Sequence, residues 1–131
     1  MISRRIISAA LRCLGHDEGR NWDYLGGLFH AGTAAGVDVQ CFVVSDGKMR
    51  FFKPDSDDLF LLVDTVKGTR EAMFHDRGGP RFRHCLAIIR GSDEKTAVAY
   101  AYEEDPDWLD VADRPQTGAQ RVPEIFDAIS T

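Results

Sequence analysis

The sequence lacks the features that mark several common classes of protein. It contains only three cysteines, Cys13, Cys41 and Cys85, which are widely spaced, odd in number and form no C-x-x-C motif. A complete disulfide framework would therefore leave one cysteine over. No segment approaches the roughly 18–20 consecutive apolar residues of a membrane-spanning helix. We therefore expect reduced, buried thiols in a cytoplasmic protein without a membrane partner.

The chain also has fewer basic than acidic residues. The chain has 16 Lys and Arg residues against 21 Asp and Glu, and its formal net charge is -5. Binding to a phosphate backbone needs a basic face, so this balance argues against nucleic acid as the main partner. The charge is better matched to a basic partner or to solubility.

With 131 residues, of which 44% are hydrophobic, the chain has the length and composition of one domain. Its hydrophobic periodicity predicts helices at 2–14 and 56–74 and a short closing helix that begins at Pro123. Alternating residues predict strands at 22–29, 37–44, 49–52, 82–90 and 96–102. This order predicts a single α+β domain spanning 1–131, with an antiparallel sheet of about five strands packed against helices on one face.

Local signals mark several boundaries of these elements. Asp46-Gly47 is a strong hairpin signal, and Ser56 is a good N-terminal cap for the second helix. The pair Gly26-Gly27 indicates a bulge or a close approach of backbones within the first strand. Residues 113–118 read as a loop, and Pro123 is acceptable at the first position of the short closing helix.

Motifs that would carry a catalytic or metal site are weak. The glycine-rich residues 27–33 have the spacing of a phosphate loop but lack its lysine, so a bend between strands explains them better. Asp55-Ser56-Asp57 resembles a metal-binding D-x-D, yet the same residues serve as a helix cap and first turn. His84 and Cys85 are adjacent in a strand, so their side chains should point to opposite faces and form no dyad. We expect no catalytic residues, no metal and no cofactor.

The most distinctive stretch follows the last predicted strand. We call residues 103–110 the acidic segment; it contains five carboxylates and one tryptophan, namely Glu103, Glu104, Asp105, Asp107, Asp110 and Trp108. The segment lacks the glycine and the distal glutamate of an EF-hand loop, so a solvated or partner-binding surface explains it better than calcium. Trp108 has two interpretations, a core aromatic at the end of the last strand or an exposed anchor for a partner.

The order of these features resembles the YezG-like immunity proteins, which accompany bacterial polymorphic toxins. The resemblance covers roughly residues 2–108. It is carried by the amphipathic first helix, the Trp22 strand, the Asp46-Gly47 hairpin ending in Phe51-Phe52, the helix near 57–73, and the late strands running into Tyr102-Glu103-Glu104-Asp105 and Trp108. It implies a cytoplasmic, non-enzymatic α+β protein that binds and blocks a cognate toxin, often a nuclease.

The leading hypothesis is therefore an immunity protein that acts by stoichiometric binding through the acidic segment, with Trp108 as an anchor. One alternative is a small enzyme or ligand-binding protein with a site assembled from His30, Asp55 and His84. Another is an oligomeric scaffold, such as a homodimer, that pairs through an exposed strand edge.

Overall fold

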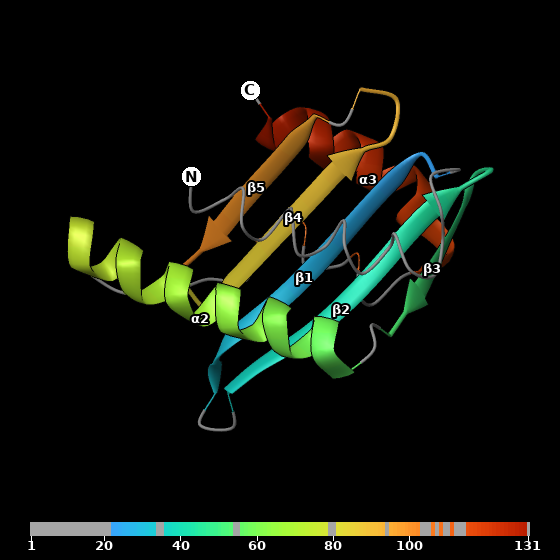
Figure 1. Cartoon of the computed structure of the whole chain (residues 1–131). Helices are drawn as coiled ribbons and strands as arrows, with labels where there is room; N and C mark the ends of the chain where they lie inside the picture. Colours follow the sequence, from blue (N-terminus) through green and yellow to red (C-terminus); the bar gives the residue numbers. More distant parts are fainter. Residues whose placement is uncertain are drawn as a thin grey trace.

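A computed structural model of the chain describes residues 22–33, 36–53, 56–78, 81–93, 95–102, 106, 108, 111 and 115–130. The predicted helix at 2–14 lies outside the described residues. The five strands are β1 (Tyr24–Thr33), β2 (Gly36–Ser45), β3 (Lys48–Phe52), β4 (His84–Arg90) and β5 (Thr96–Ala101). They form one open sheet in the order β3-β2-β1-β4-β5, and every neighbouring pair is antiparallel (Figure 1). The predicted α+β fold with a five-stranded antiparallel sheet is confirmed.

The hairpin between β2 and β3 forms where its turn signal predicts. Both turn residues have positive φ, 54° for Asp46 and 73° for Gly47. A two-residue turn with positive φ at both positions matches the right-handed twist of the flanking strands. The turn thereby fixes the register in which Ser45 faces Lys48 and Val44 faces Met49.

Helix α2 (Ser56–Arg77) begins at the predicted cap and continues about a turn beyond the predicted end. It stops where Gly78 adopts a positive φ of 68° and its amide donates to the carbonyl of Phe74. Such a left-handed glycine just past the last turn is a common helix terminator. The side chain of Arg70 then donates to the carbonyl of Phe82 at 2.7 Å, which ties the helix to the chain entering β4.

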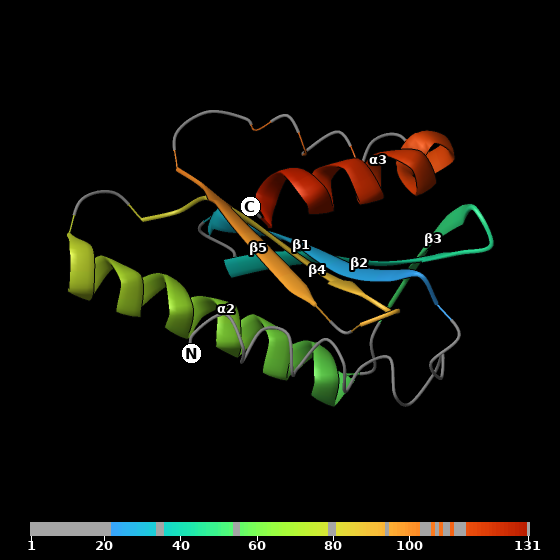
Figure 2. The same cartoon turned by 90° about the horizontal axis from the view of Figure 1, so that it is seen from above.

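The two helices lie on opposite faces of the sheet, as Figure 2 shows with α3 above and α2 below. The expectation of helices on one face is therefore wrong. On the α2 face, the buried core consists of Trp22, Leu25, Phe29, Ala31, Cys41, Val43, Leu62, Val66, Phe82, Cys85, Ala87 and Ile89. On the α3 face, it consists of Leu28, Phe42, Val44, Leu86, Ile88, Ala97, Trp108, Val111, Val122, Ile125 and Phe126. Alternate residues of the central strands thus supply two separate apolar layers.

Helix α3 (Pro115–Ile129) is longer than predicted and begins earlier. Residues 115–118 are helical rather than loop, and Pro123 lies inside the helix rather than at its first position. The reason is packing on both sides of Pro123. Gly118 lies so close to Met49 of β3 that a Cβ there would overlap the methionine sulfur, and Val122 and Phe126 are fully buried. These contacts outweigh the local preference of proline for a helix start.

The two glycines of β1 accommodate aromatic rings rather than a bulge. The pairing of β1 with β2 runs without a shift from Tyr24 to Ala31, and the irregularity lies between Ala31 and Thr33. A Cβ on Gly26 would overlap the ring of Phe42, and one on Gly27 would lie 2.7 Å from the ring of Phe29. The absence of side chains therefore lets a phenylalanine pack directly on the backbone on each face.

Neither of the described helices is long and apolar enough to cross a membrane.

Candidate functional site

Of the acidic segment, the structure describes Pro106 and Trp108. The five carboxylates predicted to bind a toxin, Glu103, Glu104, Asp105, Asp107 and Asp110, lie outside the described residues. Trp108 is 9% exposed and belongs to the core on the α3 face, and Val111, three residues later in the chain, is also buried there. Of the two interpretations of Trp108, this burial agrees with the core aromatic.

Strand β5 contributes only small side chains to the core on the α3 face. Its residues on the α3 face are alanines, Ala97, Ala99 and Ala101, and all three belong to or pack against the cluster that contains Trp108. Small side chains at alternate positions leave a shallow surface that a bulky aromatic can cover. The α3 face of β5 therefore has room for the indole of Trp108, a residue that lies among the carboxylates in the sequence.

Two histidines of the enzymatic alternative come together on the same face. His30 of β1 and His84 of β4 are direct cross-strand partners in the register. Their Nδ1 atoms are 3.0 Å apart, and their ring centroids are 4.5 Å apart. At this distance, the Nδ1 of one imidazole donates its proton and the Nδ1 of the other accepts it.

The strand register explains why these two rings meet. The amide of Ala31 donates to the carbonyl of Arg83 at 2.7 Å, so that pair is hydrogen-bonded across the ladder. In antiparallel sheets such pairs alternate with closer ones that share no backbone hydrogen bond, and the next pair is His30 and His84. The side chains therefore leave the backbone at the closest spacing that a sheet provides.

The surroundings of the pair are apolar on one side and polar on the other. Leu28 and Leu86, two residues along each strand on the same face, are buried, whereas Asp38 of β2, directly across from His30, is exposed. His84 itself is 8% exposed and His30 is half-buried. The pair thus lies at the end of an apolar layer. Asp55, the third residue of the enzymatic alternative, lies outside the described residues.

Cys85 is separated from the histidine pair by the sheet, as its place in the strand predicts. Its side chain is fully buried in the core on the α2 face, and burial raises the pKa of its thiol to about 12. A thiol with such a pKa stays protonated and unreactive at neutral pH. Cys41 is likewise a buried thiol outside any disulfide on this face, so the prediction of reduced, buried thiols is confirmed for both; Cys13 lies outside the described residues.

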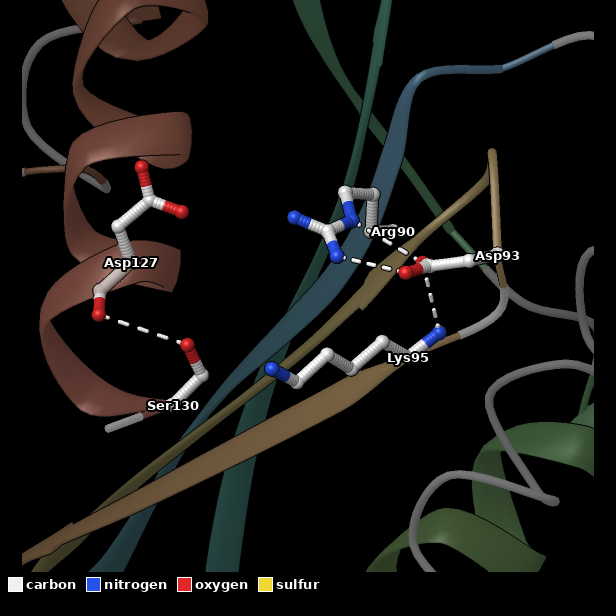
Figure 3. A network of polar contacts seen from close by, with 5 residues as sticks. All are labelled: Arg90, Asp93, Lys95, Asp127 and Ser130. Carbon is white, nitrogen blue, oxygen red and sulfur yellow. Dashed lines mark hydrogen bonds and ion pairs between the residues drawn. The ribbon is translucent and has the colours of Figure 1, made fainter.

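The other end of β4 holds an ionic network that fixes the β4–β5 turn (Figure 3). Arg90 donates two hydrogen bonds to the carboxylate of Asp93, at 3.0 and 2.6 Å, and the amide of Lys95 donates to the same carboxylate. These hydrogen bonds, the one from Arg90 first, lower the pKa of Asp93 to about 2. The Arg90 guanidinium also lies 4.9 Å from the ring centroid of Phe126, which links the turn to α3.

Two further observations bear on whether the histidine pair belongs to a larger binding site. Within the described part of the chain, no group of three or more His, Cys, Asp or Glu side chains is arranged to hold a metal ion. A pocket of about 380 Å³ lies beside edge strand β3, lined in part by Val39, Phe51 and Leu59, and it does not include the histidine pair. The histidine pair is therefore a two-residue site on the sheet rather than part of this pocket.

Comparison with known proteins adds no assignment. Neither the scan against protein-family models nor the search of curated proteins found a match to the chain. The resemblance to YezG-like immunity proteins therefore rests on the residues quoted in the sequence analysis and stays a prediction.

The pairing of His30 with His84 was the part of the site that sequence reasoning missed. The two residues are 54 positions apart in the chain and carry no spacing motif. The available signal was that both lie in predicted strands. Only the pairing of β1 with β4, which are not consecutive strands, brings them together.

Proposed function

We propose that this protein is an immunity-type inhibitor, which binds a cognate bacterial toxin stoichiometrically in the cytoplasm and blocks it through the acidic segment. The observation that supports this most directly is the distribution of charge. The segment holds five of the chain's 21 acidic residues and none of its 16 basic ones. The rest of the chain has 16 of each, so the net charge of -5 equals that of these eight residues.

The scaffold supports the proposal because ordered residues precede the segment, lie within it and follow it in the sequence. Strand β5 ends at Ala101, two residues before Glu103. Trp108 and Val111 are buried in the core on the α3 face. A binding segment whose neighbours are packed in a core has less conformational freedom to lose on association.

The chemistry of five carboxylates indicates the kind of toxin surface that they would fit. A toxin that acts on nucleic acid presents a cationic groove for phosphate, and carboxylates can occupy such a groove and compete with the substrate. Opposite charges also steer association, which raises the rate of encounter by roughly 10–1,000-fold at low ionic strength. The inhibitor needs no catalytic group of its own for this mechanism.

The test is co-expression and affinity capture with the product of the neighbouring gene, followed by kinetics with a charge-neutralised variant. Replacing Asp105, Asp107 and Asp110 together with Asn should slow association by about tenfold or more at low salt. The same variant should lose most of the salt dependence of the association rate, because fewer charges remain to be screened.

A matched control removes three carboxylates elsewhere. Asp64, Asp76 and Asp127 are all exposed, and their combined replacement by Asn changes the net charge by the same amount. If the association rate depends on the position of the carboxylates rather than on the total charge, this control should associate at nearly the native rate. A neighbouring gene product that is neither toxic nor bound would remove the immunity proposal. Equal rates for the two triple variants would remove the acidic segment from the interface.

A further inference from the structure

We infer that His30 and His84 form a binding site for a divalent transition-metal ion, coordinated by the Nδ1 atoms of both rings and favouring nickel(II) or copper(II). This inference is independent of the proposed inhibition of a toxin, because it concerns the α3 face of strands β1 and β4 alone. It starts from the direct approach of two imidazole nitrogens on neighbouring strands. Imidazole nitrogen is a favoured ligand for zinc, copper and nickel.

The separation of the nitrogens selects the coordination geometry. Two nitrogens each about 2.0–2.1 Å from one ion are about 2.8–3.0 Å apart when they occupy positions at right angles. In a tetrahedral site the same bond lengths place them about 3.3–3.4 Å apart. The Nδ1 atoms are 3.0 Å apart, which fits adjacent positions of a square-planar or octahedral centre. Copper(II) and nickel(II) adopt these geometries with nitrogen and oxygen ligands.

The strands hold the two ligands in place before an ion arrives. The two histidines lie on the adjacent inner strands β1 and β4, which are flanked by β2 on one side and β5 on the other. Their backbones are fixed by the ladder, and His84 is almost completely buried. The backbones of both ligands are therefore already in place, so binding costs little conformational entropy.

The side chains across from the pair determine what completes the coordination. On β5, the partner of His84 is Ala101, which offers no ligand. On β2, the partner of His30 is Asp38, an exposed carboxylate that adds negative charge beside the ion. Among the described residues no group of three or more His, Cys, Asp or Glu side chains is arranged to hold a metal ion, so this part of the chain supplies two ligands and leaves the other positions open to water. A site of two imidazoles and water is weaker than a structural metal site and exchanges its ion readily.

Without an ion, the pair shares one proton between the two Nδ1 atoms. When an ion binds, it takes the place of that proton, and the donor ring moves its hydrogen from Nδ1 to Nε2. No redox change or co-reactant is required. Because a protonated imidazole has no lone pair to donate, the affinity should fall as the solution becomes acidic.

The test is calorimetric titration of the full-length, tag-free chain with nickel chloride, and separately with copper chloride, in a non-coordinating buffer. We expect one ion to bind per chain at this site. His30→Gln and His84→Gln should each weaken that binding by about tenfold or more, because one of two protein ligands is lost. His75→Gln is the matched control, since His75 is exposed on α2, and it should bind like the native chain.

Folding is checked by circular dichroism, because His84 is buried and its replacement can disturb the sheet. His30 is half-buried, so His30→Gln decides the question if His84→Gln does not fold. Binding that is unchanged in His30→Gln would place the ion elsewhere in the chain and overturn the inference. Absence of binding to the native chain with either ion would leave the pair as a hydrogen bond only and would also overturn it.

Discussion

Truncation of Phe126 tests whether α3 closes the second face of the sheet. The side chain of Phe126 is fully buried, its ring centroid lies 5.7 Å from that of Tyr24, and the Arg90 guanidinium lies 4.9 Å from it. Phe126→Ala removes the ring and leaves a cavity between α3 and the sheet. The expected loss is about 3–5 kcal/mol of unfolding free energy. A domain has only about 5–15 kcal/mol in total, so the variant should be close to its limit of stability.

The matched control is Phe60→Ala, which makes the same chemical change on α2. Phe60 is 73% exposed, so its truncation should change the unfolding free energy by no more than about 0.5 kcal/mol. Unfolding in urea is followed by far-ultraviolet circular dichroism, with tryptophan fluorescence as a second probe. Each face of the sheet carries one tryptophan in its core, Trp22 with α2 and Trp108 with α3.

Two results would refute this reasoning. A loss below about 1 kcal/mol for Phe126→Ala would mean that α3 does not pack against the sheet as described, because a buried phenylalanine cannot be removed at so small a cost. Equal losses for the two variants would mean that burial does not distinguish the two positions. In either case the two-faced core would have to be abandoned.

Four other changes have defined outcomes. Gly68→Ala should raise the unfolding free energy by about 0.5–1 kcal/mol, because Gly68 lies inside α2 and a Cβ there meets nothing within 4 Å. Gly26→Ala should lower the melting temperature, because its Cβ would overlap the ring of Phe42. The double variant His30→Cys with His84→Cys should form a disulfide under mild oxidation, since Cα atoms of such a strand pair are about 4.5 Å apart, within the usual range for a disulfide. In a Cys13→Ser background, no thiol should react with a colorimetric reagent at neutral pH, and two should react after unfolding. Since the pKa of Cys85 rises from 9.0 to about 12 in the folded state, its contribution to stability is complete below pH 9 and is lost as the pH rises towards 12.

Three of these predictions would be contradicted by a specific result. A Gly68→Ala chain with an unchanged or lower melting temperature would contradict an open, solvent-facing glycine. Failure of the double-cysteine variant to crosslink, with the fold intact, would contradict the register between β1 and β4. Rapid labelling of Cys41 or Cys85 in the folded chain would contradict their burial in the core on the α2 face.

The strands and the first described helix could be predicted because their signals are local. Asp46 and Gly47 both adopt the positive φ that the hairpin needs, and these residue types tolerate it at low cost. Ser56 and Gly78 lie at the two ends of α2, where a cap and a left-handed glycine are expected. Such signals depend on a few neighbouring residues, so they can be read from the sequence alone.

The placement of α3 could not be predicted in the same way. Pro123 is well suited to a helix start, but the helix begins at Pro115, since Gly118 and Val122 pack on the sheet. Helix α3 covers the face of the sheet opposite α2, and this position also depends on which face of each strand carries the larger apolar side chains. Strands β1 and β4 have them on both sides, and the continuous burial of β4 is typical of a strand covered on two faces.

The histidine pair was beyond prediction for a further reason. Its formation needs β1 to pair with β4, and the register must be correct to a single residue, because a slip of one residue would turn one ring to the opposite face. Neither condition leaves a local signal near His30 or His84. The sequence supported these residues only as members of a site assembled from distant segments, and their contact follows from the sheet.

The double covering of the sheet has a consequence for backbone amide hydrogen exchange. Every residue of β4 except Arg90 is buried, and the strand has β1 and β5 as neighbours and an apolar layer on each side. Its central amides can exchange with solvent only when several elements open together. They should therefore be among the slowest in the chain, whereas those of edge strand β3, with three of its five residues exposed, should exchange far sooner. Such a gradient across the sheet would identify β1 and β4 as the last part of the fold to open.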